Sequence, residues 1–184
     1  MPATVSFVDP RAQRASVAEP YDLRWDTSRG PPPTIGILVN NFFDSEAFAE
    51  ALSQALSQRL PGVGVRVWNK LDPSTPAPPE LIDEVAQETA VCISLIGHCG
   101  SCTSGTVRDA INLARRGNPS VALATEMFEQ HAAFIAAAAG IPDIPVVVLP
   151  HPVAGTGAKN FKAVSESAAP DILTAFGVDV AVPA

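Results

Sequence analysis

Two cysteines at C-x-x-C spacing, Cys99 and Cys102, are the residues of this sequence with the clearest capacity for chemistry. An apolar run, residues 90–96, precedes them, and a segment with helical periodicity follows, which predicts a strand, a tight turn and a helix. The start of a helix carries partial positive charge and free N–H groups, and both stabilise a thiolate, the reactive form of cysteine. The second cysteine of such a pair can resolve a mixed disulfide or a sulfenic acid. The spacing therefore predicts a thiol site at this turn.

The other residues of the turn favour close approach of a ligand to the backbone. Gly100 and Gly105 permit unusual φ angles, and we predict Thr103 or Ser104 as the N-cap of the helix. Turns of this geometry bind phosphate in other proteins. We therefore expect Gly100, Ser101 and Thr103 to contact the substrate.

Two histidines leave a second interpretation of the turn open. His98, Cys99, Cys102 and His151 have the residue types of a Cys2His2 metal site, which would indicate a metal-dependent lyase or hydrolase. In the thiol interpretation, His151 is either a base or proton donor beside the thiolate or a simple turn histidine.

Three further residues with reactive side chains have mainly structural interpretations. Cys92 lies in the middle of an apolar run and is expected in the core, and His131 lies on an alanine-rich helix and is expected at the surface. Glu126 could orient His151, hold a substrate cation or cap the helix that begins near Phe128.

The rest of the sequence alternates between strand and helix patterns. Residues 1–33 are proline-rich and predict an irregular arm draped over the domain or a partner subunit, and residues 34–184 predict one α/β domain. The predicted strands lie near residues 34–41, 63–67, 90–96, 121–124 and 145–150. The predicted helices lie near residues 48–60, 80–88, 107–117, 128–139 and 160–176, the last with a break at Pro170. This alternation predicts a doubly wound parallel sheet in the flavodoxin-like order 2-1-3-4-5.

Parallel strands place all their carboxyl ends at one edge of the sheet, where ligands of such folds bind. That rule brings the residues after the first, third, fourth and fifth strands to the same edge. Besides the cysteine turn and His151, the predicted substrate-binding residues there are Asn40, Asn41 and Glu126.

Composition and charge exclude several classes of partner. The chain of 184 residues has a formal net charge of −7 and no basic run, which argues against nucleic acid and anionic membranes as partners. The sequence shows neither a signal peptide nor an apolar run of the length a membrane span needs. The chain has three cysteines, and this odd number argues against a framework of structural disulfides. We therefore expect a protein of the reducing cytoplasm.

The run Cys99-Gly100-Ser101-Cys102-Thr103-Ser104, followed by Val107 and Asp109, resembles the signature of the UGSC family, whose members carry selenocysteine or cysteine at its first position. The run also resembles the selenocysteine-x-x-Cys-Thr segment of the selenoprotein B component of glycine, sarcosine and betaine reductases. The likeness extends over roughly residues 35–158 and includes His151-Pro152. The resemblance implies that Cys99 is the attacking group and that Cys102 resolves.

Together, the residues and the resemblance predict a thiol-dependent oxidoreductase, or a subunit of one, that acts on a small molecule. We expect reductive cleavage or redox conversion with an external dithiol as the reductant and no bound cofactor. Glycine reduction itself is not expected, because it needs a pyruvoyl-bearing subunit. A homo-oligomer or a partner subunit is expected. The alternatives are the metal-dependent enzyme and a non-catalytic, redox-sensing subunit.

Overall fold

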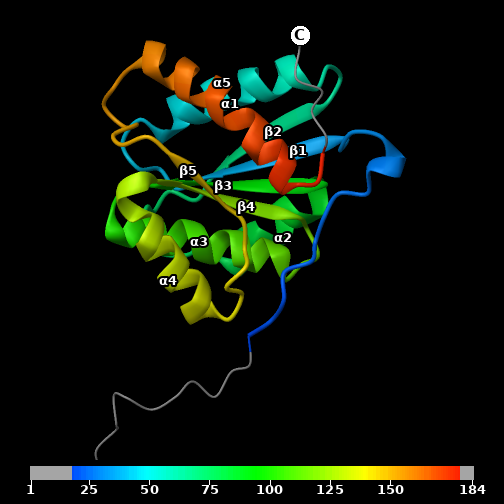
Figure 1. The fold of residues 1–184 in the computed structure, drawn as a ribbon, viewed down its shortest axis with the longest axis horizontal. Coiled ribbons are helices and arrows are strands. Elements are labelled where there is room, and N and C mark those ends of the chain that lie inside the picture. The colour runs from blue at the N-terminus through cyan, green and yellow to red at the C-terminus, as the bar shows by residue number, and fades with distance from the viewer. Residues whose placement is uncertain (1–17, 179–184) are drawn as a thin grey trace, which may run out of the picture.

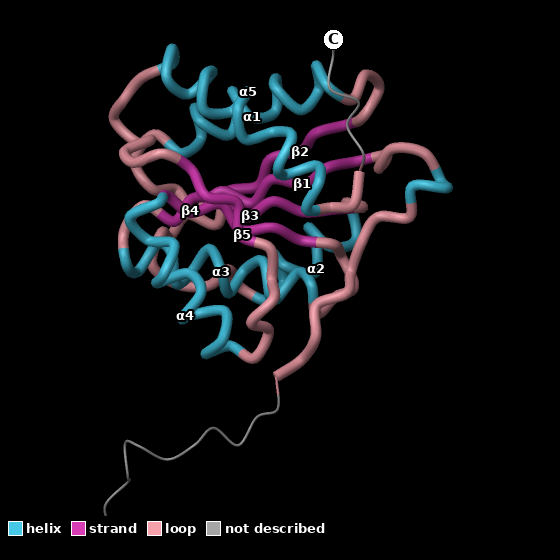
Figure 2. Tube along the Cα trace, viewed as in Figure 1, coloured by secondary structure: helices cyan, strands magenta, loops and turns pink. Residues whose placement is uncertain are grey.

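The computed structural model describes residues 18–178, which form a five-stranded sheet between two layers of helices (Figure 1). The strands are β1 (Thr34–Val39), β2 (Gly64–Asn69), β3 (Val91–Gly97), β4 (Ser120–Thr125) and β5 (Val146–Leu149). The helices are α1 (Ser45–Arg59), α2 (Pro79–Glu88), α3 (Gly100–Ala114), α4 (Glu129–Ala139) and α5 (Ala158–Ala175), with short 3-10 turns at Thr27–Arg29 and Glu126–Phe128. Helices α1 and α5 cover one face of the sheet, and α2, α3 and α4 cover the other (Figure 2).

The strands pair in the order β2-β1-β3-β4-β5, and every pair is parallel, which confirms the predicted doubly wound arrangement. All residues of β3 and β4 are buried, as expected for central strands that helices cover on both faces. The carboxyl ends of all five strands therefore meet at one edge, and the loops that follow them are neighbours in space.

Helix α5 corrects one boundary prediction. The helix runs without a break from Ala158 to Ala175 and includes Pro170. A proline inside a helix removes one backbone hydrogen bond. Ala169, Ile172 and Leu173 around it are fully buried in the core that α5 shares with α1. Apolar burial on this scale offsets the lost hydrogen bond, so the helix continues through the proline.

The described part of the amino-terminal arm, residues 18–33, lies along the domain. The Tyr21 hydroxyl accepts a hydrogen bond from Ser120 N (2.7 Å) and donates one to Ser120 O (3.0 Å), at the start of β4. Trp25 N donates to Phe176 O (2.8 Å), which ties the arm to the end of α5. Residues 1–17 of the predicted arm lie outside the described residues.

A buried ion pair fixes the loop after β2 against α3. Lys70 Nζ lies 2.6 Å from Asp109 Oδ2 and 2.6 Å from Thr75 O, and both charged side chains are 1% exposed. The other carboxylate oxygen of Asp109 accepts a hydrogen bond from Ala77 N (2.7 Å). Gly105 makes this approach possible, because a Cβ there would lie 3.0 Å from Lys70 Nζ. The loop is thereby held beside the first turns of α3.

Removing Lys70 should destabilise the fold strongly. Burial raises the pKa of the Asp109 carboxyl and Lys70 opposes that rise, so Lys70→Met leaves a buried carboxylate without its partner. We expect a loss of about 3–5 kcal/mol in the free energy of unfolding, measured by chemical denaturation. The matched control is Lys162→Met, which breaks the exposed Lys162–Glu166 pair and should cost less than about 1 kcal/mol. Equal losses for the two variants would contradict a structural role for the buried pair.

Candidate functional site

Cys99 is the N-cap of α3, which corrects the prediction of Thr103 or Ser104. Its backbone is extended (φ −146°), and its Sγ accepts a hydrogen bond from Cys102 N at 3.2 Å. Thr103 instead lies in the first turn, where its N–H and hydroxyl both donate to Cys99 O, at 2.9 and 2.6 Å. The helix thus begins four to five residues earlier than predicted, because the cysteine sulfur takes the capping role that a hydroxyl usually fills.

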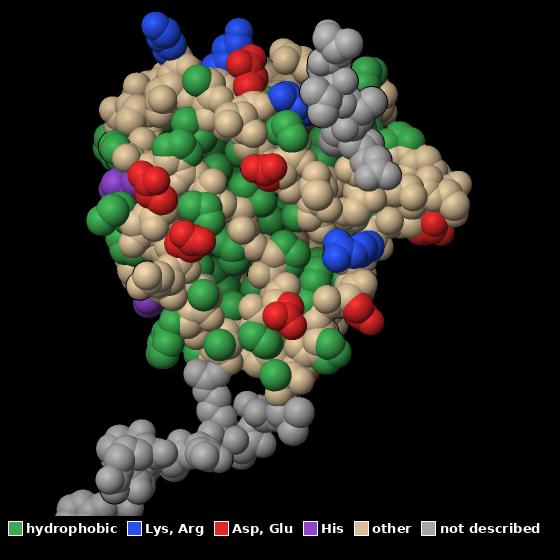
Figure 3. Space-filling model, in the orientation of Figure 1, with side chains coloured by type: hydrophobic (Ala, Val, Ile, Leu, Met, Phe, Trp, Pro, Cys, Tyr) green, Lys and Arg blue, Asp and Glu red, His purple; other side chains and the backbone are tan. Residues whose placement is uncertain are grey.

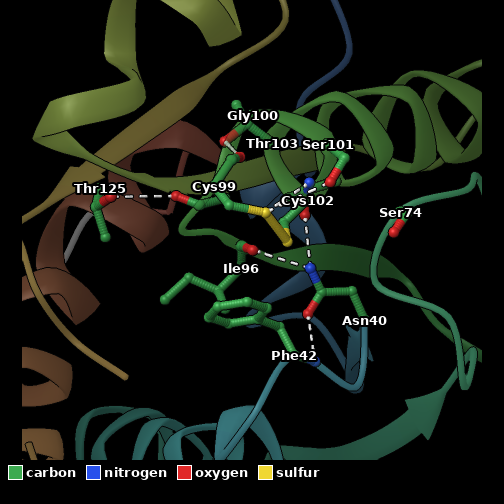
Figure 4. Close-up of a disulfide and its surroundings, with 12 residues drawn as sticks. Asn40, Phe42, Ser74, Ile96, Cys99, Gly100, Ser101, Cys102, Thr103 and Thr125 are labelled. Carbon is green, nitrogen blue, oxygen red and sulfur yellow. Dashed lines mark hydrogen bonds between the residues drawn. A yellow bond between two sulfur atoms is a disulfide. The ribbon is translucent and has the colours of Figure 1, made fainter. Parts of the chain in front are cut away.

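The two cysteines form a disulfide, with Cα atoms 5.2 Å apart (Figure 4). They differ in exposure: Cys99 is half-buried, whereas Cys102 is 2% exposed. The Ser101 hydroxyl lies 3.6 Å from Cys99 Sγ. Cys99 is therefore the more accessible cysteine of the pair.

Close packing at the end of β3 holds this turn in place. A Cβ at Gly97 would lie 2.8 Å from Thr103 Oγ1 and 3.0 Å from Ala124 Cβ, so glycine is needed where β3, β4 and α3 meet. Neither Gly100 nor Gly105 has the unusual φ that we expected, since both have helical backbone in α3. Gly105 serves instead to admit the loop that carries Lys70.

Four rings form a continuous row beside Cys99, which we call the ring row: Phe42, His98, His151 and Phe128. Their centroids are 5.4 Å apart between Phe42 and His98 and 4.5 Å between His98 and His151. His151 and Phe128 are 6.1 Å apart. The row connects the loops after β1, β3, β4 and β5. It places His151 at the same sheet edge as the cysteine turn, in contact with the residue that precedes Cys99.

His98 anchors the loop that follows His151. Its Nε2 accepts hydrogen bonds from Val153 N (3.1 Å) and Ala154 N (3.3 Å), so Nε2 is unprotonated and Nδ1 carries the proton. Burial and the neighbouring His151 lower the pKa of His98, which agrees with a neutral ring. Gly155 N in the same loop donates to both carboxylate oxygens of Asp44, at 3.0 and 3.3 Å.

The alternative metal-ligand set is not assembled in the described structure. The acceptor nitrogen of His98 is engaged by backbone N–H groups, and the two cysteine sulfurs are bonded to each other. Within residues 18–178, no group of three or more His, Cys, Asp or Glu side chains is arranged to hold a metal ion.

A hydrogen-bond chain across three strands fixes His151. The Thr125 hydroxyl donates to Gly97 O (3.2 Å), and His151 Nδ1 lies 3.0 Å from the same hydroxyl oxygen. Since a hydroxyl has one proton and Gly97 O can only accept, His151 Nδ1 is the donor to Thr125. In the neutral ring, Nε2 of His151 is then the nitrogen without a proton, and it makes no hydrogen bond to the part of the chain that the structure describes. The neutral ring therefore has an unoccupied acceptor nitrogen.

The predicted substrate-binding residues fall into two groups. Gly100, Ser101, Asn41 and Glu126 are exposed. Glu126 Oε1 accepts a hydrogen bond from His151 N (3.2 Å), so Glu126 contacts the histidine as one of its three predicted roles requires. Its side chain does not cap the following helix, which was another of those roles.

The other two predicted residues, Asn40 and Thr103, are buried and engaged within the protein. The amide nitrogen of Asn40 donates to Ile96 O (2.9 Å), and its amide oxygen accepts from Phe42 N (3.2 Å). Asn40 therefore joins the loop after β1 to the end of β3.

Sequence reasoning gave no role in the site to Thr125, Asp44 or His131. Thr125 ends β4, and the rule that places His151 at this edge places Thr125 there too, but its hydrogen bond to the histidine could not be read from the sequence. Asp44 precedes α1, where its side chain makes no capping hydrogen bond. His131, which we expected to be a surface residue, is half-buried, and its Nε2 lies 3.0 Å from Gly100 O. That contact depends on the packing of α4 against α3, which no local pattern encodes.

Fold and turn together define a doubly wound α/β protein with a C-x-x-C disulfide at the carboxyl edge of its sheet. The chain belongs to the UGSC family, whose model matches residues 6–178, and the family predicted from the motif is thereby confirmed. No curated protein sequence matches the chain. Across residues 18–178, no helix has the length and apolar character needed to cross a membrane.

Replacing Thr125 should change the tautomer of His151. In the wild type we expect the Nδ1–H form, read from ¹⁵N chemical shifts of the imidazole ring. Thr125→Val removes the hydroxyl and should convert a measurable fraction to the Nε2–H form, whereas Thr125→Ser keeps the hydroxyl and should preserve the wild-type tautomer. An Nε2–H ring in the wild type would contradict the hydrogen-bond chain.

Protonation of His98 should loosen the loop after His151. Its pKa lies below the ordinary 6.5, so its stabilising contribution is present above that pH and is lost as pH falls through the lowered pKa. We expect the amide signals of Val153 and Ala154 to titrate with a midpoint below pH 6.5 in NMR spectra, because protonated Nε2 no longer accepts. In His98→Gln this titration should disappear. A midpoint at or above 6.5 would show that the ring is not held neutral.

Proposed function

We propose that this protein is a thiol-dependent oxidoreductase, or a subunit of one, that cleaves or converts a small molecule reductively at Cys99. One observation carries the proposal: an accessible cysteine caps a helix directly in front of a buried cysteine that can bond to it. The pair has the asymmetry that attack and resolution require, since the first sulfur must be reached by a reactant and the second must not compete for it.

In the reduced protein, the attacking group is the Cys99 thiolate. The N–H of Cys102 points at the Cys99 sulfur, at 3.2 Å, and the amino end of α3 contributes its partial positive charge. Both features favour the thiolate of Cys99 once the disulfide is reduced. The third cysteine differs, since Cys92 is fully buried and burial raises the pKa of its thiol to about 12.

The reaction that fits this pair transfers two electrons. The Cys99 thiolate bonds to an electrophilic atom of the substrate and displaces a leaving group or opens a bond. The Cys102 thiolate then attacks Cys99 Sγ, which forms the disulfide and releases the substrate fragment with the electron pair of the broken bond. An external dithiol returns two electrons and two protons to the pair. No bound cofactor is needed in this cycle.

His151 is the group that moves a proton in this scheme. Its unprotonated Nε2 can take the proton of Cys99 or of a bound reactant, and can return it to the released fragment. The exposed residues Asn41, Ser101 and Glu126 lie in the loops around it and are the proposed substrate contacts. The predicted likeness to selenoprotein B belongs to this proposal, with sulfur in place of selenium.

The cell compartment and assembly state belong to the same proposal. A cycle that starts from two thiols needs a reducing environment, which supports the cytoplasm. The net charge of −7 supports a small-molecule or protein reactant over nucleic acid. A homo-oligomer or partner subunit is part of the proposal, and a redox-sensing subunit is its main competitor. Turnover of a substrate by the isolated chain would separate the two.

Alkylation of the reduced protein tests the proposed thiolate. We expect iodoacetamide to label Cys99 faster than Cys92 or Cys102, with an apparent pKa below the ordinary value of about 8.5. Peptide mass mapping of timed samples measures the three rates, and His151→Asn should raise the apparent pKa of Cys99 if the histidine acts on it. Equal labelling of Cys99 and Cys92 in the folded protein would overturn the proposal, because Cys92 is buried and held as a thiol.

A further inference from the structure

Three large apolar side chains are exposed in the loops around the cysteine turn. Phe43 follows β1, Leu71 follows β2 and Met127 follows β4, and their exposed fractions are 77%, 74% and 70%. In the strand order β2-β1-β3-β4, the loop of Cys99 lies between those of Phe43 and Met127. We call these three residues the apolar rim. Most proteins leave single apolar residues exposed, but a group of them around one reactive side chain indicates an interaction surface.

Hydrogen bonds and ring contacts connect the loops that carry the apolar rim. The Asn69 amide donates to Asn41 Oδ1 (3.1 Å), which joins the loop of Leu71 to the loop of Phe43. From Phe42, the ring row runs through His98 and His151 to Phe128, the neighbour of Met127. All four rings are half-buried. The rim and the ring row therefore form one surface with Cys99 beside it, and Figure 3 shows histidine side chains at the left margin with hydrophobic side chains next to them.

Two rim residues have backbone conformations that bulky side chains rarely adopt. Phe43 has φ 40° and Leu71 has φ 64°, a region that bulky side chains rarely adopt and that costs free energy. Asparagine side chains support both turns, since Asn40 Oδ1 accepts from Phe42 N (3.2 Å) and Asn69 Oδ1 accepts from Leu71 N (2.8 Å). The protein therefore maintains these exposed apolar groups at a cost in stability.

The charges around the apolar rim determine which class of macromolecule can bind there. Exposed carboxylates lie in these loops or beside them, at Glu46, Asp72 and Glu126, whereas Lys70 is buried in its ion pair. The negative charge around the apolar rim repels nucleic acid and anionic lipid, and it attracts a protein surface with basic side chains or tolerates one with few acidic side chains.

We propose that the apolar rim and ring row dock a protein dithiol whose reactive cysteine lies on an apolar face with few acidic neighbours. This inference rests on the proposed function, and it identifies the reductant as a protein. The partner's thiolate attacks Cys99 Sγ, because Cys102 is 2% exposed, and Cys102 leaves as a thiolate. The partner's second thiolate then attacks its own bonded sulfur, which releases Cys99. Two electrons and two protons pass to this chain, and the partner becomes a disulfide.

The test compares a protein dithiol with a small one. The triple variant Phe43→Asn, Leu71→Asn, Met127→Gln removes the apolar surface, and asparagine tolerates the positive φ at the first two positions. We expect the rate constant for reduction of Cys99–Cys102 by reduced thioredoxin to fall by about tenfold or more. The rate with dithiothreitol should stay within about twofold, because a small dithiol needs no docking surface. Val67→Thr, an exposed change within β2, is the matched control and should alter neither rate.

Each other outcome has a definite meaning. Equal slowing with both reductants would show that the rim shapes the disulfide itself and would overturn the docking proposal. An unchanged rate with thioredoxin, or a wild-type pair that only dithiothreitol reduces, would overturn it as well, while leaving Cys99 as a nucleophile. The labelling experiment on Cys99 decides the proposed function separately.

Discussion

The candidate site depends on one constraint, which is that all five strands run in the same direction. Parallel strands deliver their following loops to one edge, so residues as distant in sequence as Phe42 and His151 both contact His98. The buried strands β3 and β4 fix the positions at which Cys99 and Thr125 follow them. The cysteine turn, the ring row and the apolar rim all lie in loops whose position this constraint determines.

Two histidines in contact have different environments and therefore different properties. His98 accepts hydrogen bonds from two backbone N–H groups through one ring nitrogen, and its lowered pKa favours the neutral ring. His151 uses Nδ1 to reach Thr125 and leaves the other nitrogen without a partner among the described residues. The first ring positions the loop that carries the second. The proposed proton transfer at this edge therefore involves His151, whereas His98 holds the loop in place.

The sequence predicted the fold well because its signals were local and repeated. Predominantly apolar runs such as residues 90–96 indicated central strands. The alternation of strands with helices then restricted the possible strand orders to a few. The cap of α3 was mispredicted because threonine and serine are the usual caps, whereas here an extended cysteine accepts the bond. The predicted break at Pro170 was wrong for a related reason. The low helix propensity of proline indicated a break, but burial of the residues around Pro170 stabilises the continuous helix. The contacts of His98 with Val153 and of His131 with Gly100 join segments far apart in sequence, so no spacing could reveal them.

Helix α3 is buried along most of its length, and ten of its 15 residues, Cys102 and Asp109 among them, are buried. The tight junction at Gly97 holds its amino end, and the ion pair at Asp109 holds it further along. A helix held in this way has little freedom to shift when the sulfur–sulfur bond opens. The oxidised and reduced proteins should therefore have nearly the same shape, with the difference confined to two side chains. A partner that distinguishes the two states would then have to contact the two cysteine side chains themselves.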